Sequence, residues 1–318
     1  MNRKQFEQQR GPQWVRLKKI LDGLDRRRGE PVDRQEMPRL HRRACRDLSL
    51  AQDRMYGLAM VDRINRLVRR GYRHLYRDRR LGLYDILDFI FVTFPRLVRA
   101  NWHLLLLCTT TFVIPFLAMA FSIQDDPAWV HSVLGPKGME EVEASYGHER
   151  IMSRDTDSNV AMFGLYIYNN VSIDFKTFAG GLLCGVGALF FLFFNGLHLG
   201  AFTGYVHEAA SPENFWSFVS GHSSFELIGM LIAGMAGMKL GLAILKPGRM
   251  TRREALRVRG REGVRLLYGA ATLTILAAFI EAFWSAQSLP PSIKYTVGAS
   301  LWVLLIVYLG FSGRWHDA

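Results

Sequence analysis

A few ionisable or amide side chains stand inside otherwise apolar stretches of this sequence, and they are the first candidates for chemistry. Glu226 and Glu281 have apolar neighbours on both sides, and Asn195 interrupts another apolar stretch. His222 precedes Glu226 by four residues, so the two share one face of a helix. A carboxylate inside a lipid bilayer is costly and usually faces the protein interior or a water-filled cavity. The sequence therefore predicts an intramembrane polar cluster of Asn195, His222, Glu226 and Glu281.

Such a cluster has a structural and a functional interpretation. In the structural one, hydrogen bonds among the groups fix the helix packing, with Glu226 protonated or paired to His222. In the functional one, the cluster serves transport, gating or contact with a partner. A metal site of His207, Glu208, His222 and Glu226 is disfavoured, because its spacing matches no closed zinc pattern. We therefore predict no metal and no cofactor.

Catalytic motifs are missing from the sequence. It contains no GxSxG, no phosphate-binding P-loop and no HExxH. Its three cysteines, Cys45, Cys108 and Cys184, have neither metal-ligand nor redox spacing. We therefore name no catalytic residue and predict that the chain is not an enzyme.

The elements that must hold the cluster are long apolar blocks. A hydrocarbon core about 30 Å thick needs roughly 20 apolar residues per helix. Backbone amides in lipid must bond within their own segment, so the blocks should be helices, and their residue types exclude an alternating barrel. The fold class is therefore all-α, a polytopic helical membrane protein after a soluble helical N-terminal domain. Its roughly five embedded blocks are residues 102–122, 178–206, 222–246, 264–287 and 295–312.

Glycines recur at helical spacing in the second apolar block. Small residues let helices approach closely in a membrane, which most often means packing within one chain, with a homo-oligomer seam as the alternative. The candidate packing glycines are Gly180, Gly181, Gly185, Gly196, Gly200 and Gly204.

Charge predicts the orientation. Residues 1–100 carry 25 Lys and Arg against 12 Asp and Glu, whereas residues 124–159 carry 3 against 8. Because positive loops stay in the cytoplasm, the N-terminus should be inside and 124–159 should form an acidic external loop. Residues 246–265, with 8 basic against 2 acidic side chains, should also be inside, yet five plain crossings would place them outside. A re-entrant hairpin in 178–206, split at Asn195 and Gly196, restores the rule; five plain spans that violate it are the alternative.

The sequence predicts two domains, residues 1–95 and residues 96–318. Residues 1–95 should form a basic, cytoplasmic helical domain, which suits anionic membrane lipids better than nucleic acid, since no nucleic-acid motif accompanies the charge. Residues 160–177 are too polar to span and should lie at the outer interface. Three helix faces are expected in the first domain: Trp14, Leu17, Leu21 and Leu24; Leu40, Ala44, Leu48, Ala51 and Met55; and Ile64, Leu67, Val68, Leu75 and Tyr76.

An ordered set of short motifs gives the chain a resemblance. It runs from Asp47-Leu48-Ser49-Leu50-Ala51 and Ile64-Asn65-Arg66-Leu67-Val68 through Tyr168-Asn169-Asn170, Phe178-Ala179-Gly180-Gly181 and Asn195-Gly196-Leu197-His198-Leu199-Gly200. It continues with Gly221-His222-Ser223-Ser224-Phe225-Glu226-Leu227, Ala233-Gly234-Met235-Ala236-Gly237, Pro247-Gly248-Arg249 and Ile280-Glu281-Ala282-Phe283. On these motifs the chain resembles the stage II sporulation protein M family. The sporulation proteins resemble only the part from about residue 95 onward, and the N-terminal domain is similar to that of longer relatives.

The resemblance implies a non-enzymatic membrane component. In sporulation, members of the family anchor a peptidoglycan-degrading assembly during membrane remodelling. The expected function is therefore a multi-pass scaffold of the cytoplasmic (inner) membrane that acts in envelope remodelling with protein partners. The alternative is a transporter or channel component with a polar pathway between its helices.

Overall fold

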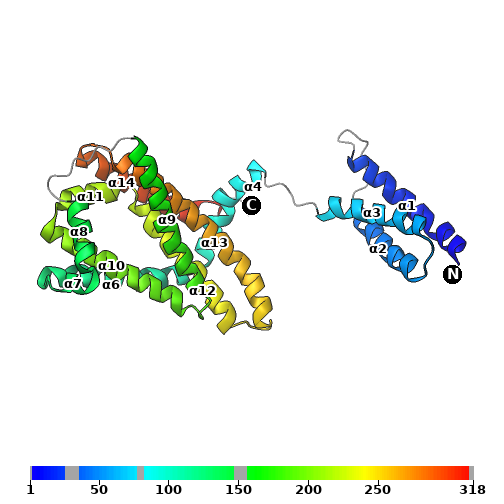
Figure 1. Ribbon diagram of the computed structural model, residues 1–318, viewed down its shortest axis with the longest axis horizontal. Coiled ribbons are helices and arrows are strands. Elements are labelled where there is room, and N and C mark those ends of the chain that lie inside the picture. The colour runs from blue at the N-terminus through cyan, green and yellow to red at the C-terminus, as the bar shows by residue number, and fades with distance from the viewer. Residues whose placement is uncertain (1, 26–35, 77–81, 147–155, 315–318) are drawn as a thin grey trace. The chain divides into compact units, whose positions relative to one another are not determined.

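The computed structural model describes residues 2–25, 36–76, 82–146 and 156–314 and is helical throughout these ranges, with no strand among them. The chain divides into two compact units, Met1–Gly82 and Leu83–Ala318 (Figure 1). Each unit has its own hydrophobic core. The structure therefore has the predicted class, an all-α protein whose apolar helices follow a helical N-terminal region.

Unit 1 consists of α1 (Arg3–Asp25), α2 (Met37–Asp53) and α3 (Leu58–Tyr76). Apolar side chains repeat every three to four residues on each helix and meet in one core, which holds Phe6, Trp14, Leu17, Leu40 and Ile64 among others. The indole of Trp14 donates to buried Asp47 at 2.9 Å, which satisfies that carboxylate inside the core. One predicted core residue is wrong: α2 ends at Asp53, and Met55 is 88% exposed. The side chain of Tyr76 lies outside the described part.

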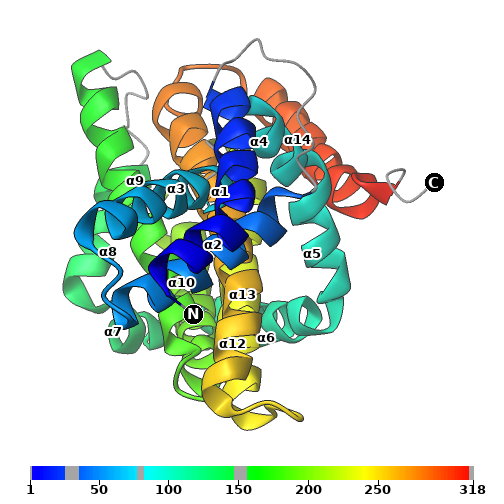
Figure 2. The ribbon, with the colours of Figure 1, turned by 90° about the vertical axis from the view of Figure 1, so that its right-hand side faces the viewer.

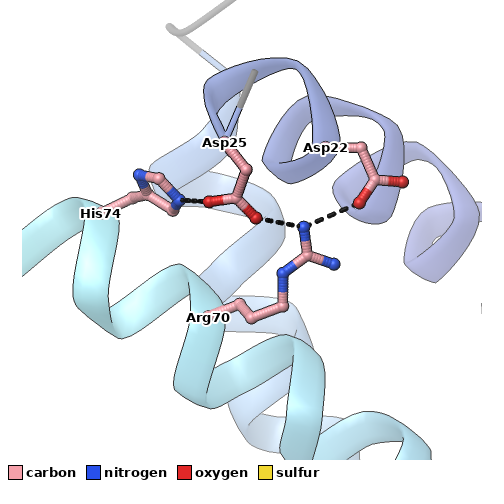
Figure 3. Close-up of polar contacts among 4 residues, drawn as sticks. All are labelled: Asp22, Asp25, Arg70 and His74. Atoms are coloured by element: carbon pink, nitrogen blue, oxygen red, sulfur yellow. Dashed lines mark hydrogen bonds and ion pairs between the residues drawn. The ribbon is translucent and has the colours of Figure 1, made fainter. Parts of the chain in front are cut away.

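An ion network ties α1 to α3 in unit 1 (Figure 3). The Arg70 guanidinium donates to Asp22 at 2.7 Å and to Asp25 at 2.6 Å, and Nε2 of His74 lies 2.7 Å from Asp25. The hydrogen bonds from Arg70 and then His74 lower the pKa of the Asp25 carboxyl from its ordinary value. Ionised Asp25 is therefore favoured by the folded state.

Unit 2 opens with a connected helical run, α4 (Leu83–Asp88), the π-helical η1 (Phe89–Thr93) and α5 (Phe94–Ala100). Its long helices are α6 (Trp102–Asp125), α9 (Thr156–Gly180), α10 (Val186–Ala209), α12 (Ser223–Leu245), α13 (Arg252–Ile280) with the π-helical η2 (Glu281–Ser285), and α14 (Pro291–Phe311). Short helices lie between them: α7 (Trp129–Val133), α8 (Gly135–Tyr146) and α11 (Pro212–Ser220). By length and composition, five described helices can cross a membrane, namely α6, α10, α12, α13 with η2, and α14.

The predicted hairpin split at Asn195 and Gly196 is wrong. α10 runs unbroken through both residues, and the apolar block 178–206 is interrupted instead by a turn at residues 181–185. In this turn Cys184 and Gly185 both have positive φ, 55° and 87°. A Cβ on Gly181 would lie 2.0 Å from the Gly237 carbonyl oxygen, so the turn packs directly on the α12 backbone. The sequence marked the wrong residues because Asn-Gly is a turn signal only where packing does not impose a helix.

The termini of the long helices of unit 2 meet at two opposite ends of the bundle. At one end Lys239 of α12 donates to Asn101 at 2.8 Å and pairs with Glu262 of α13, and Arg99 caps the carbonyls of Leu309 and Ser312. The turn 181–185 lies at this end against Gly241. We call it the basic end; it also carries the α12–α13 connection, yellow in Figures 1 and 2.

The opposite end is acidic and carries the short helices. Tyr205 near the end of α10 donates to Glu143 of α8 at 2.5 Å, and Ser211 donates to the carbonyl of Tyr146 at 3.0 Å. Ser220 of α11 contacts Gly298 of α14. We call this the acidic end; in Figure 1 it lies at the left of unit 2, with α7, α8 and α11.

Helix α9 runs between these two ends. Its first turns contact η2 through the rings of Phe163 and Phe283, 5.7 Å apart, and its last residues reach the turn at the basic end. It packs on α10, α12 and α13, and Figure 1 shows it lying along α13. With α9 counted, the six long helices described in unit 2 alternate in direction. Helix α9 has 25 residues and is about 37 Å long at 1.5 Å per residue, which is sufficient to cross a bilayer.

Close packing by glycine appears on α10. Gly196, Gly200 and Gly204 lie against the backbone oxygens of Phe112, Phe116 and Ala120 on α6. The α6–α10 pair is thus an intramolecular contact of small residues of the kind found between membrane helices.

Six alternating helices make a topology prediction that centres on Cys184. If α9 crosses, the turn 181–185 and the 246–251 connection share the cytoplasmic side, and the charge rule holds without a hairpin. In a Cys45→Ser/Cys108→Ser background, a membrane-impermeant maleimide should label Cys184 only after the membrane is permeabilised. The cysteine of a Gly138→Cys variant, which also carries Cys184→Ser, should react in intact spheroplasts. Labelling of Cys184 from outside would place α9 at the surface.

The Asp25 network predicts a pH-dependent stability of unit 1. Because the folded pKa of Asp25 is lowered, its contribution exists above the unfolded value, about 3.9, and disappears as pH falls through the lower folded value. Asp25→Asn in a fragment of residues 1–82 should lower the unfolding free energy at pH 6 by about 0.5–1 kcal/mol, as exposed pairs do. Urea titrations should show this difference shrink as the pH falls below about 3.9. Asp62→Asn, at an exposed position, should change little at either pH.

Candidate functional site

The start of α12 is docked tightly against η2. A Cβ on Gly221 would lie 2.4 Å from the Trp284 ring and 3.1 Å from the Ser285 hydroxyl, so only glycine allows this approach. The contact brings His222, the N-cap of α12, beside Ser285, with ring Nδ1 3.2 Å from the hydroxyl oxygen. Because π-helical turns are wider than α-helical ones, the side chains of η2 leave the helix in directions different from those of a continued α13.

Three metal-ligating side chains meet at this junction. Nε2 of His222 lies 3.8 Å from a carboxylate oxygen of Glu226, one turn further along α12. Glu281 opens η2 and is 9% exposed. One ligand atom from each of His222, Glu226 and Glu281 lies within 4.8 Å of the others. We call these residues the His222 trio.

A buried lysine stands next to the trio. Lys294, in the first turn of α14, is 1% exposed, and its ammonium donates to the carbonyl of Ser285 at 2.9 Å. A buried ammonium requires hydrogen bonds or an opposite charge nearby. The acidic end of the bundle therefore contains carboxylates, an imidazole and an ammonium in one small volume.

A cavity of about 180 Å³ lies deeper in the bundle, between α6, α9, α10, α12 and α13. Two carboxylates, Asp174 and Glu226, line it, and among its described lining residues there is no Lys or Arg. Its lining consists of Phe112, Asn169, Asn170, Ile173, Asp174, Asn195, His198, Leu199, Glu226, Leu227, Met230 and Thr274. Glu226 belongs both to this cavity and to the His222 trio.

Asp174 is the most enclosed acid of the cavity. It is 1% exposed and accepts a hydrogen bond from Thr274 of α13 at 2.6 Å. A Cβ on Gly229 of α12 would lie 2.6 Å from the Thr274 hydroxyl, so a glycine makes room for this bond. One turn before Asp174, Asn170 accepts a hydrogen bond from Asn169 at 2.9 Å. Three helices thus hold one buried carboxylate in place.

The predicted polar cluster is distributed over these two features. His222, Glu226 and Glu281 come together in the trio, whereas Asn195 lies in the cavity and donates to its own helix at the carbonyl of Phe191, 2.7 Å away. His207 contacts Trp216 at the acidic end and is not part of the trio. The role of the cluster stays a prediction.

Asp174, His198 and Lys294 were missed by the sequence analysis. Asp174 lies in the segment assigned to the surface because of its low hydropathy. One signal could have found it: Asn170, Asp174 and Thr177 repeat every three to four residues and are all buried on one face of α9. When the polar residues of a membrane helix recur at helical spacing, they form one face, and that face is usually directed toward the protein interior.

The electrostatics of the cavity favour a positive occupant. Two carboxylates and His198 face a volume that no described Lys or Arg lines, in a surrounding of low dielectric where unscreened charges interact strongly. A proton or a small cation removes this repulsion, and the amides of Asn170 and Asn195 offer additional oxygen ligands. The geometry of an acyl-transfer or phosphoryl-transfer site does not occur in the cavity, which among its described residues has no Ser or Cys nucleophile.

Comparison with known proteins gives two family matches. The family model described as Stage II sporulation protein M matches residues 105–286, which is more than half of the chain and contains the cavity and the trio. A second model, described as Domain of unknown function (DUF8413), matches residues 4–77, the helices of unit 1. No curated protein and no solved structure matches the chain.

Proposed function

The chain belongs to the stage II sporulation protein M family, and from its geometry we propose that it moves a small cation across the membrane through the cavity between α9, α10 and α12. The single observation that carries this proposal is the cavity itself, with Asp174 and Glu226 facing it from two helices. Of the two functions that the sequence suggested, this is the transporter or channel component.

The cavity argues against a purely structural role for the polar groups. Hydrogen-bonded clusters that fix helix packing fill their own volume, because membrane helices associate through close packing. Here about 180 Å³ is left open beside two acids, although a carboxylate in a bilayer is costly. Functional pathways in membrane proteins are where such acids are retained.

The orientation belongs to the same proposal. With six crossings, the basic end faces the cytoplasm, the N-terminal unit is cytoplasmic, and α7, α8 and α11 face the outside of the inner membrane. The sum of charges agrees, +13 for residues 1–100, −5 for 124–159 and +6 for 246–265. A cation then reaches the acids of the cavity from the acidic end.

Flux measurements test the transport proposal. Full-length protein in liposomes loaded with pH-, Na⁺- or K⁺-sensitive dyes should carry at least one of these cations down an imposed gradient. Glu226→Gln and Asp174→Asn, which keep size and remove charge, should each lower this flux about tenfold or more, the loss that 1.4 kcal/mol of binding produces. Glu213→Gln, at an exposed acid of the acidic end, is the matched control and should leave flux unchanged. Equal flux in all four proteins, or none in the wild type, would reject the proposal.

A scaffold in envelope remodelling is the second candidate. The observation that favours it is unit 1, which has a hydrophobic core of its own and many exposed basic residues. A basic helical unit on a membrane protein is suited to bind a protein partner or anionic lipid.

Affinity purification tests the scaffold. Tagged full-length protein extracted from native membranes should retain the same envelope proteins in repeated purifications, and a chain that starts at residue 83 should lose them. Transport by a chain that retains no partner would assign the function to unit 2 alone.

A further inference from the structure

We propose that the His222 trio is a binding site for a divalent transition-metal cation, Zn²⁺ or Mn²⁺, at the acidic end of the bundle. It joins side chains from α12 and η2 that are far apart in the sequence, and Glu226 connects it to the cavity. The site rests on its own geometry and does not depend on the transport proposal.

The distances suit one ion after a small closure. Zinc lies about 2.0–2.2 Å from imidazole nitrogen and carboxylate oxygen, so two tetrahedral ligands are roughly 3.3–3.5 Å apart. In the structure, Nε2 of His222 and the nearest Glu226 oxygen are 3.8 Å apart, and all three ligand atoms lie within 4.8 Å. If side-chain rotation moves the carboxylate oxygens by about 1 Å, all three ligand atoms can coordinate one ion. Three protein ligands leave a fourth position open, as in sites that exchange their ligands.

The second nitrogen of His222 is placed as in a metal site. Metal-binding histidines normally donate their other ring N–H to a neighbouring acceptor, which fixes the tautomer. In the tautomer that carries its proton on Nδ1, His222 donates to the Ser285 hydroxyl oxygen 3.2 Å away. Nε2 then carries the lone pair and faces Glu226 at 3.8 Å, beyond hydrogen-bond reach.

The ligand chemistry selects the class of metal. One imidazole with two carboxylates is a mixed nitrogen and oxygen set, which suits Zn²⁺ or Mn²⁺. Mg²⁺ and Ca²⁺ prefer oxygen alone, and Cu(I) prefers sulfur. Access also differs within the trio: the side chain of Glu226 is 33% exposed and that of His222 only 5%, so an ion would enter past Glu226.

Lys294 provides the rival explanation of the same cluster. Its ammonium at the Ser285 carbonyl lies close enough to offset part of the negative charge of the trio. If Lys294 is the resident cation, no metal binds. If a metal binds, the ammonium competes with it, so Lys294→Met should tighten metal binding, an effect that a folding defect would not produce.

Equilibrium dialysis of the purified full-length protein tests the site. After treatment with chelator, wild-type protein should bind Zn²⁺ at one site more tightly than Mn²⁺ and should not bind Mg²⁺, the order expected for such ligands. His222→Ala and Glu281→Gln should each weaken Zn²⁺ binding by about tenfold or more, at least as much as loss of an outer-shell partner does. His131→Ala, an exposed histidine on α7 of the same acidic end, is the matched control. X-ray absorption of the Zn²⁺-loaded protein should show one nitrogen among its light-atom ligands, and Glu281→Gln should change that spectrum.

Each outcome decides. Unchanged Zn²⁺ binding in Glu281→Gln, or an equal loss in His131→Ala, overturns the site and leaves surface binding as the explanation. Should His222→Ala fail to fold, the test rests on the other two variants: Glu281→Gln should weaken Zn²⁺ binding and Lys294→Met should tighten it. Asp174→Asn should leave Zn²⁺ affinity intact whether or not it stops flux, so loss of transport and loss of the metal site are separable.

Discussion

Unit 2 depends on how closely its helices can approach α12. Of the five apolar helices described, α12 is the most enclosed, with 72% of its most apolar stretch buried against 17–56% for the others. Glycines make this possible: Gly229 faces Thr274, Gly234 faces Leu192, and Gly237 faces the carbonyls of Thr177 and Phe178. Because lipid tails are as apolar as leucine, helices in a membrane gain little from hydrophobic burial and must associate through such close contacts. A larger side chain at Gly237 would separate α12 from α9 and thereby open the polar face of α9 to lipid.

The polar face of α9 links close helix packing to the position of a buried acid. Asn170, Asp174 and Thr177 are tolerable in a bundle only if other helices cover them, and α10, α12 and α13 do so. The hydrogen bond from Thr274 satisfies one side of the Asp174 carboxylate. Its other surroundings include the cavity that it shares with Glu226. The same packing that covers the polar face of α9 therefore places Asp174 and Glu226 at one cavity.

What the sequence could predict was local, and what it missed was long-range. Hydropathy is a property of about twenty neighbouring residues, so it identified the apolar helices, and the four-residue spacing placed His222 and Glu226 on one face. The burial of the polar face of α9 depends on which helices cover it, so average hydropathy could not show that Asp174 is enclosed. The turn at Cys184 carries no strong local signal, because a non-glycine residue with φ of 55° is imposed by packing on Gly241 rather than favoured by its type. Likewise, nothing near Lys294 in the sequence indicates that it reaches Ser285, since that contact requires α14 to fold back onto η2.

The two ends of the bundle differ in how closely their charged side chains contact polar partners. At the basic end, Arg99 donates to two carbonyls, and Lys239 pairs with Glu262 and donates to Asn101, so both cations have fixed partners. Toward the acidic end, Glu226 has His222 no nearer than 3.8 Å and remains one-third exposed. A cation entering the bundle therefore meets an incompletely compensated carboxylate first from the acidic end. Glu226 belongs both to the trio and to the cavity lining. The proposed metal site and the proposed cation pathway therefore share this side chain, and α12 is the helix that positions it.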